Sequence, residues 1–419
     1  TFKMKKIFYV FLLCLNIISL LGKPTEFIEW RSEFLKAVRE ESLSPNLMVR
    51  NLAIFSISVH DAVNSLEKKY HPYLKFHNHD LNAWDLNSVI AGCGSYIGKN
   101  LHPARAANFE KLAYFTRKEN SDLKHKSFLF GQKVARFFLQ HRKNDGASTT
   151  VTYVPRTSPG LWRRTPSFFR PPEQPHWRKV KTFAVKSLDE FMPPPPPNPT
   201  DKLFLDSLRE VKILGSKDSQ IRSTEQTFIA QFWKDFSYTQ TPPGHWNDIA
   251  AEVCKAEKYS LLDEARIFAM LNIALADSGI IAWECKYRYH MWRPIHAIRL
   301  ADQFPQSTKY VNKQWESLLE SPAHPEYVSA HSFFSGTAAV ILSKIYGSDK
   351  YKFRVQSDQF PNQKREFNSF SSCAEEIALS RLYGGIHYRF SNDRGIENGK
   401  KLGLYFYNHT LQPLTQFQK

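Results

Sequence analysis

Long runs of like charge are missing from this 419-residue sequence, although its overall charge is strongly basic. The chain has 57 Lys and Arg against 40 Asp and Glu, which gives a formal net charge of +17 at pH 7. The basic residues are spread along the chain, whereas nucleic-acid-binding proteins usually cluster them on one face. The composition therefore argues against a nucleic-acid partner. It leaves two explanations for the excess, a solvated basic surface or a site for an anion.

Paired cysteine motifs are also missing. No CxxC spacing occurs among the five cysteines, so the sequence offers no zinc or dithiol redox motif. One of the five lies in the N-terminal segment, and the others are Cys93, Cys254, Cys285 and Cys373. Disulfide pairing and buried free thiols both remain open for these four.

Hydrophobic runs long enough to span a membrane are absent after the first residues, so no integral membrane domain is expected. The exception is the N-terminus, where Lys3, Lys5 and Lys6 precede an apolar stretch over residues 7–21. This stretch is short for a membrane span of about 20 residues and suits the core of a signal peptide. Residues 1–22 are therefore predicted to be a signal peptide that directs export to the periplasm or the medium. A poor cleavage site keeps an uncleaved membrane anchor as the alternative.

Convincing alternation of polar and apolar residues is lacking too, and we find no internal repeat. Apolar residues instead recur at helical spacing, which predicts an all-α fold built from helical bundles. The break PPGHW at 242–246 is expected to separate two helices. Helices are predicted over residues 25–41, 45–66, 103–115, 122–141, 201–214, 223–235, 247 to about 292 with an interruption near Ser260, 312–320, 332–346, 363–384 and 396–408.

Proline is concentrated in residues 144–200, together with several tryptophans and phenylalanines. Proline at this density excludes helix and central strand, and a disordered linker would not carry so many aromatic residues. We expect a long ordered loop that lies over the helical core and shapes the mouth of a pocket. Its five-proline run, residues 193–197, would divide an N-terminal helical region, 23–200, from a C-terminal helical domain, 201–419, that carries the site; the alternative is that the run simply crosses the surface.

The chemically informative residues lie in three stretches of the last third of the chain. They read AWECKYRYHMWRPIHAIR from residue 282, HPEYVSAHSFFSG from residue 324 and SRLYGGIHYRFSND from residue 380. They provide three cations, a hydroxyl and two imidazoles, with no carboxylate beside the central residues. A tetrahedral oxyanion such as phosphate or vanadate is the ligand that suits this set. The residues are Lys286, Arg293, Ser329, His331, Arg381 and His387.

Each stretch also has a purely structural interpretation. Lys286 and Arg293 are seven residues apart, which places them on one helical face if Pro294 ends that helix, but an ordinary basic stripe has the same spacing. Ser329 begins a helix whose N–H groups would suit an anion, yet a plain Ser N-cap looks alike. Lone histidines are usually structural. The convergence of three such segments favours an anion site.

These stretches resemble the vanadium haloperoxidase and type 2 phosphatidic acid phosphatase superfamily. Its signatures are K-x6-RP, PSGH and SR-x5-H-x3-D. They correspond here to Lys286 with Arg293-Pro294, to residues 328–331, and to Arg381 with His387. The similarity extends over about residues 46–410 and is most specific in 277–391, where it resembles an exported bacterial haloperoxidase-like branch.

The resemblance implies helical bundles of the vanadium chloroperoxidase and acid phosphatase type. His387 would bond the central atom of the oxyanion, and His331 would be the acid–base residue. The activity would be oxidation of a halide by hydrogen peroxide at a bound vanadate. The alternatives are hydrolysis of a phosphomonoester through a phosphohistidine and a non-catalytic oxyanion-binding protein. The groups that would hold the oxyanion are Lys286, Arg293, Ser329, the Ala330 amide and Arg381.

The sequence departs from the family signatures at three positions. Val328 replaces Pro, Ala330 replaces Gly, and Ser391 stands where many members have an Asp that orients the histidine. Asp393 could replace that Asp only if the loop differs.

Two further positions match the pocket walls of the family. Trp283 matches an aromatic residue of fungal-type chloroperoxidases. His324 falls where those enzymes have Phe and algal bromoperoxidases have His. The two positions together give mixed signals about the halide.

Overall fold

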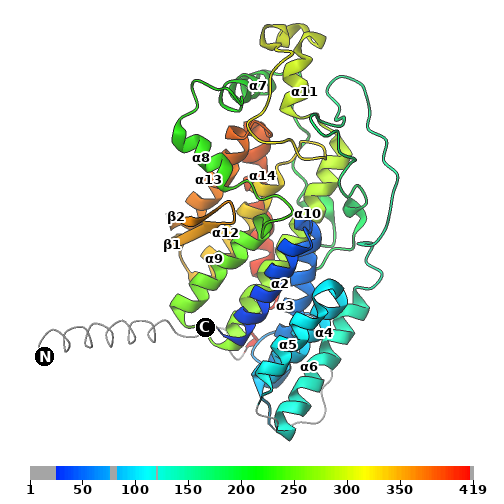
Figure 1. Cartoon of the computed structure of the whole chain (residues 1–419), viewed down its shortest axis with the longest axis vertical. Helices are drawn as coiled ribbons and strands as arrows, with labels where there is room; N and C mark the ends of the chain where they lie inside the picture. Colours follow the sequence, from blue (N-terminus) through cyan, green and yellow to red (C-terminus); the bar gives the residue numbers. More distant parts are fainter. Residues whose placement is uncertain (1–24, 76–82, 119–120, 416–419) are drawn as a thin grey trace, which may run out of the picture.

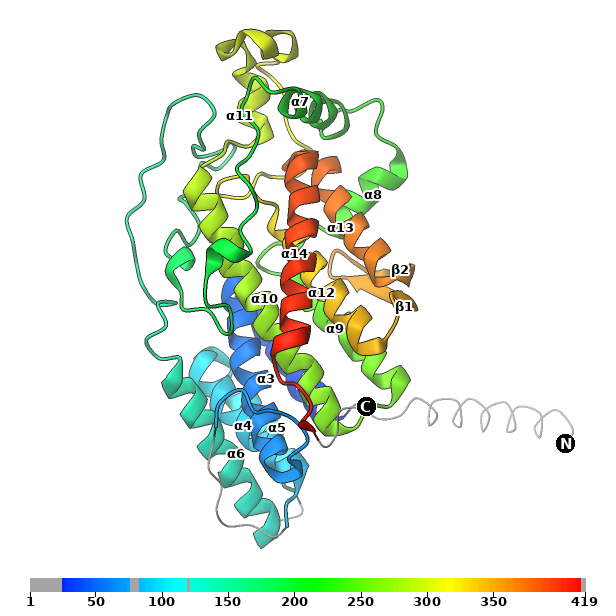
Figure 2. The ribbon, with the colours of Figure 1, turned by 180° about the vertical axis from the view of Figure 1, so that it is seen from behind.

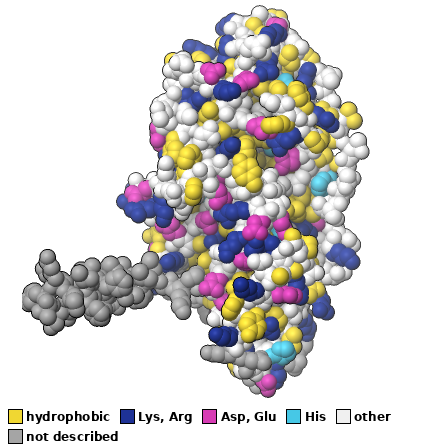
Figure 3. All heavy atoms as spheres, in the orientation of Figure 1, with side chains coloured by type: hydrophobic (Ala, Val, Ile, Leu, Met, Phe, Trp, Pro, Cys, Tyr) yellow, Lys and Arg dark blue, Asp and Glu magenta, His cyan; other side chains and the backbone are white. Residues whose placement is uncertain are grey.

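The computed structural model describes residues 25–75, 83–118 and 121–415. The predicted signal peptide lies outside these residues. Helices dominate the structure, as the all-α prediction requires (Figure 1). Over the face shown in Figure 3, Lys and Arg are interspersed with Asp and Glu.

The longest helix, α10 (Leu261–Tyr289), runs through the middle of the molecule (Figures 1 and 2). It begins where Ser260 accepts a hydrogen bond from the Asp263 amide, which confirms the predicted interruption at Ser260. Helix α3 (Pro45–Glu67) packs along it. Among the described helices, α10 alone is long and apolar enough to cross a membrane, but 94% of that apolar window is buried inside the fold. This burial is typical of a central core helix.

Four helices of the N-terminal part form a group next to α3 (Figure 1): α2 (Glu26–Glu40), α4 (Leu86–Leu101), α5 (Ala106–Thr116) and α6 (Asp122–His141). Helices α4 and α6 pack against α3, and α5 packs against α4. The sequence did not predict α4, because its three glycines lower helix propensity. The structure uses them for close packing. A Cβ at Gly92 would lie 2.2 Å from the carbonyl oxygen of Phe128 on α6, so the two helices can approach closely only without it.

The remaining helices are α7 (Lys202–Leu214), α8 (Thr224–Phe232), α9 (Thr241–Glu257), α11 (Pro294–Arg299), α12 (Ala330–Tyr346), α13 (Phe370–Tyr383) and α14 (Arg389–His409). Two sequence predictions are wrong here. The expected break at 242–246 lies inside the first turns of α9, where proline is tolerated because those N–H groups have no partner within the helix. Residues 312–320 form turns and not a helix.

A β-hairpin also contradicts the sequence analysis, which expected a helix from residue 363 and found no alternation. Strand β1 (Lys350–Ser357) pairs antiparallel with β2 (Phe360–Ser369). The buried residues of β1 are Phe353, Val355 and Ser357, which is a period of two. Exposed polar residues, Arg354 and Gln356, fill the intervening positions, and the pattern was too short to be recognised.

The proline-rich segment 144–200 is an ordered loop on the helical core, as predicted. Trp162 and Trp177 are fully buried in it. The carboxylate of Asp277 on α10 accepts hydrogen bonds from the backbone amides of residues 183–185 and so ties the loop to the core. The predicted division of the chain near residue 200 stays a prediction. The four cysteines in the described residues are free and buried.

The contact between α12 and α14 fixes the positions of the site stretches, because both helices begin at site residues. Small residues let the two backbones touch. A Cβ at Gly399 would lie 2.3 Å from the Phe333 carbonyl oxygen, and one at Gly336 would lie 2.5 Å from the Ile396 carbonyl oxygen. The side of α14 that faces α12 therefore requires glycine.

Gly399→Ala is expected to lower the free energy of unfolding by about 1–3 kcal/mol, because the added methyl group must push α14 away from α12. Urea denaturation followed by circular dichroism measures this. Lys401→Ala, on the exposed side of the same helix, is the control and should change stability by less than about 0.5 kcal/mol. Equal effects of the two substitutions would contradict the close packing.

Candidate active site

The three sequence stretches meet at the C-terminal end of α10, towards α11 (Figure 1). Lys286 lies in the last turn of α10, and the helix ends at Tyr289, followed by His290 in the left-handed conformation. Arg293 lies beyond the helix, and Pro294 begins α11. The prediction that Lys286 and Arg293 share one helical face is therefore wrong. Both side chains are nevertheless fully buried at the same place.

Lys286 is held by backbone carbonyl oxygens. Its Nζ donates to the carbonyls of Pro325, Glu326 and Val328 at 3.2, 2.9 and 2.5 Å. An ammonium group has three protons, so all of them are used. Burial, together with the neighbouring Arg293, lowers the pKa of Lys286 well below its ordinary value. Lys286 thus fixes the loop before α12, and it would have to release a carbonyl to contact an oxyanion.

Arg293 connects the second and third stretches. Its Nε donates to the His324 carbonyl at 3.1 Å and its Nη1 to the Ile386 carbonyl at 2.8 Å. Nη1 also lies 3.1 Å from Nε2 of His387, and Nη2 lies 3.0 Å from Nδ1 of His324. Burial lowers the pKa of Arg293 to about 10, so the guanidinium stays charged at neutral pH.

His387 is oriented by a carboxylate that the sequence analysis did not expect. Its Nδ1 lies 2.7 Å from Oε1 of Glu326, which also accepts the Tyr388 amide at 3.1 Å. Nδ1 is the donor to this carboxylate, which leaves the lone pair on Nε2. Burial raises the pKa of Glu326 to about 7, and Arg293 and Lys286 oppose that rise. The expectation that no carboxylate lies beside the central residues is wrong.

The family's Asp is absent at Ser391, but Glu326, in the loop before α12, supplies a carboxylate to His387 instead. Asp393 lies outside the cavity, where it faces Arg389 and Glu210. The Glu in HPEY was the available signal, but nothing in the sequence indicated that residues 326 and 387 would touch.

Helix α12 places Ser329 and His331 at its beginning. Ser329 occupies the N-cap position without a capping hydrogen bond, and its hydroxyl accepts one from Ser332 at 2.9 Å. Burial and nearby cations, above all Arg381, lower the pKa of His331 well below its ordinary value, so the ring is neutral. Its Nε2 is buried and has no partner among the described residues. This nitrogen is therefore available to exchange a proton with a bound ligand.

Arg381 approaches from α13. Its Nη1 donates to the Trp233 carbonyl at 2.6 Å, whereas its buried Nε has no partner in the described part of the chain. Burial lowers the pKa of Arg381 to about 10, and the nearby Asp235 opposes this decrease. Asp235 is in turn 3.0 Å from Nδ1 of His245, a contact without a signal in the sequence.

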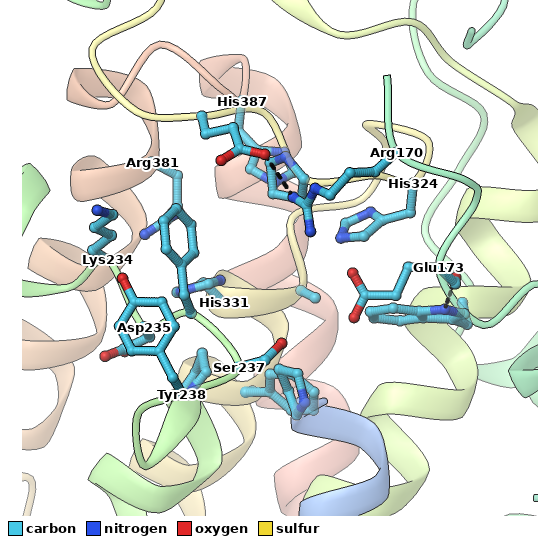
Figure 4. A pocket seen from close by; sticks show the side chains of 18 of the residues that line it. Arg170, Glu173, Lys234, Asp235, Ser237, Tyr238, His324, His331, Arg381 and His387 are labelled. Atoms are coloured by element: carbon cyan, nitrogen blue, oxygen red, sulfur yellow. Dashed lines mark hydrogen bonds and ion pairs between the residues drawn. The ribbon is translucent and has the colours of Figure 1, made fainter. Parts of the chain in front are cut away.

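A cavity of about 400 Å³ opens over these residues (Figure 4). The loop residues Phe168, Arg170 and Glu173 contribute to it, which confirms that the proline-rich segment shapes a pocket. The predicted residues Lys286, Arg293 and Ser329 lie behind the wall and do not line it. The predicted residues that line it are Trp283, His324, Ala330, His331, Arg381 and His387.

Trp283 and His324, the two predicted pocket residues, form one wall. The rings of Trp283 and His324 lie 4.9 Å apart between centroids. His324 is buried, and burial together with Lys286 and Arg293 lowers its pKa well below its ordinary value. A neutral imidazole, and not a cation, therefore faces the cavity beside Trp283.

These features suit an oxyanion. Three cations are buried around one point. Burial disfavours their charged forms and therefore lowers the pKa of each. A bound anion would offset this electrostatic cost of burial. Nε2 of His331 and Nε of Arg381, both without a partner among the described residues, lie at the same end of the cavity, and His387 has its lone pair on Nε2. The residues present thus fit an oxyanion at His387, provided that Lys286 releases a carbonyl and Arg293 releases Nε2 of His387.

The comparisons with known proteins agree with this geometry. Residues 266–416 match the family model described as the VCPO second helical-bundle domain. The chain is 22% identical over 350 residues to the vanadium chloroperoxidase of Curvularia inaequalis; the match covers 64% of this chain and 57% of that relative's length.

The fold has solved counterparts. A bacterial vanadium-dependent iodoperoxidase superposes with a TM-score of 0.82 at 25% identity, over 93% of this chain and 97% of that one. A bacterial vanadium-dependent chloroperoxidase superposes with a TM-score of 0.70 at 16% identity, over 87% of this chain and 92% of that one. In sequence and fold the chain is therefore similar to vanadium haloperoxidases, and the similarity to the family model lies in residues 266–416.

Proposed function

We propose that this protein is a vanadium-dependent haloperoxidase that oxidises a halide with hydrogen peroxide. The observation that carries the proposal is His387, a buried neutral imidazole whose Nδ1 is bonded to Glu326 and whose Nε2 lies beside Arg293 at the cavity. The relatives named above are haloperoxidases, which supports the same reading. The apolar N-terminal segment supports export as the setting of the activity.

Vanadate, when bound, would supply a Lewis-acidic centre that activates peroxide without changing oxidation state. His387 would anchor it through Nε2, and Glu326 would keep the ring in the required tautomer. Arg293 and Arg381 would donate to the oxyanion, together with Ser329 and the amide of Ala330 at the start of α12.

His331 has a separate role in this proposal. Because its ring is neutral and its Nε2 has no partner among the described residues, it can accept a proton at Nε2 from a ligand in the cavity and return it later. Trp283 and the neutral His324 form the wall that a halide would meet. The surrounding helices exclude bulk water from the cations, which strengthens their interaction with an anion.

The first experiment measures halogenation of a dye by purified protein with hydrogen peroxide and either bromide or iodide, before and after loading with orthovanadate in phosphate-free buffer. Activity that depends on vanadate is expected. His387→Ala should lose both vanadate binding, measured by equilibrium dialysis, and halogenation.

His331→Ala is the matched comparison, because it removes the proton acceptor and leaves the anchoring histidine. It should retain bound vanadate but turn over about 10²–10⁴ times more slowly. Full activity of His387→Ala would refute the site. Vanadate-inhibited hydrolysis of p-nitrophenyl phosphate without halogenation would instead identify a phosphatase that uses the same pocket.

Glu326→Ala should weaken vanadate binding by about 10–100-fold, because the residue that orients His387 is lost. Glu326→Gln keeps an acceptor oxygen and should lose less. Equilibrium dialysis with vanadate gives the affinities, and thermal denaturation verifies that each variant is folded.

Asp393→Asn is the control for that series, because Asp393 lies closer in sequence to the position of the family's Asp but outside the cavity. It should bind vanadate like the unmodified protein. A large loss in Asp393→Asn with normal binding by Glu326→Ala would show that the carboxylate roles are assigned wrongly.

A further inference from the structure

Glu173 is held rigidly in the wall of the cavity by its backbone. Its amide donates to the Ala323 carbonyl at 2.7 Å. Its carbonyl accepts from Nε1 of Trp283 at 3.2 Å and from the hydroxyl of Tyr287 at 2.8 Å. Three hydrogen bonds to two other segments thus fix where the side chain begins.

The carboxylate of Glu173 faces the cavity, as Figure 4 shows. Among the described residues, it makes no hydrogen bond and no ion pair. The other carboxylates at the cavity are matched: Glu320 pairs with Arg170 at 3.0 Å, and Asp235 pairs with His245 at 3.0 Å. Among the described acids that line the cavity, Glu173 is therefore the one whose carboxylate is in no ion pair.

The cations around Glu173 are committed elsewhere. Lys286 uses its three protons on backbone carbonyls, and Arg293 binds the carbonyls of His324 and Ile386. A bound oxyanion would neutralise the charges of Lys286, Arg293 and Arg381. An ionised Glu173 would then leave a negative charge beside the part of the cavity that the oxyanion does not fill.

Lys234, in the segment after α8, is a further cation of the cavity, but it lies on the side of Arg381 and Asp235, across the cavity from Glu173 (Figure 4). His324 faces the cavity from the loop before α12. His324 is neutral because burial lowers its pKa, so it offers no compensating charge.

We propose that Glu173 controls the access of small anions to the cavity: its charged carboxylate repels a halide, and its neutral form admits it. The inference rests on the proposed function only for the identity of the halide as substrate. The electrostatic effect itself needs only the position and charge of the carboxylate. At an effective dielectric constant of about 20, a unit charge within about 10 Å changes anion affinity by about tenfold.

The sign of the pH effect follows from the protonation of Glu173. Burial raises its pKa above the ordinary value of 4.5, and Arg170, Arg293 and Lys286 oppose the rise. Below that raised pKa the group is neutral and halide enters. Above it the group is ionised, so halide access falls as the pH increases.

A fluorescence experiment tests this without vanadate or turnover. Trp283 lies in the same cavity wall. Its share of the tryptophan fluorescence is the difference in intensity between each protein and the same protein with Trp283→Phe. Iodide, an anionic quencher, should quench this contribution about tenfold more effectively in Glu173→Gln than in the unmodified protein at pH 8. Acrylamide, a neutral quencher, should act equally on both. Asp393→Asn, which removes a carboxylate outside the cavity, is the control and should resemble the unmodified protein.

The kinetic counterpart uses the vanadate-loaded enzyme. The KM for halide should rise with pH in the unmodified protein and change much less in Glu173→Gln, with kcat similar in both. Iodide quenching and KM profiles that are the same with and without the Glu173 charge would overturn the proposal. If no halogenation occurs, the proposed function fails, while the quenching experiment still decides the role of Glu173.

Discussion

Three cationic side chains are buried at one end of the helical core, and the backbone around them is arranged to stabilise their charge. Burying an ion costs several kcal/mol unless polar groups replace the lost water. Carbonyl oxygens do this here. Lys286 binds the carbonyls of residues 325, 326 and 328, Arg293 binds those of 324 and 386, and Arg381 binds that of Trp233. The same bonds hold the three site stretches together, so the scaffold and the anion site depend on each other.

The helices determine where those stretches meet. The glycines of α14 let it lie against α12, which brings the residues before each helix, His387 and Ser329, to the same end of the core. Glu326 then reaches His387 from the loop that Lys286 holds. The proline-rich loop closes the other side, and it adds an acid, Glu173, to a site otherwise rich in positive charge. The cavity thus combines a cationic end suited to an oxyanion with a wall whose charge depends on pH.

Much of this could be read from the sequence because the informative patterns were local. The apolar spacing and the caps at Thr25 and Ser260 located helices well, and the three stretches identified the residues around the cavity. Local patterns failed where packing decided the outcome. The glycines of α4 looked unfavourable for a helix but serve its contact with α6, and the short alternation of β1 was not recognised. The pairing of Glu326 with His387 joins residues 61 positions apart, and no spacing rule predicts it.

The measurement that tests the central claim most directly is a crystal structure of the protein soaked with orthovanadate in phosphate-free solution. The account predicts tetrahedral or five-coordinate density at the end of the cavity, bonded to Nε2 of His387 and contacted by Arg293 and Arg381, with Nδ1 of His387 still bonded to Glu326. Density elsewhere in the cavity with His387 unattached, or an empty cavity at saturating vanadate, would contradict it.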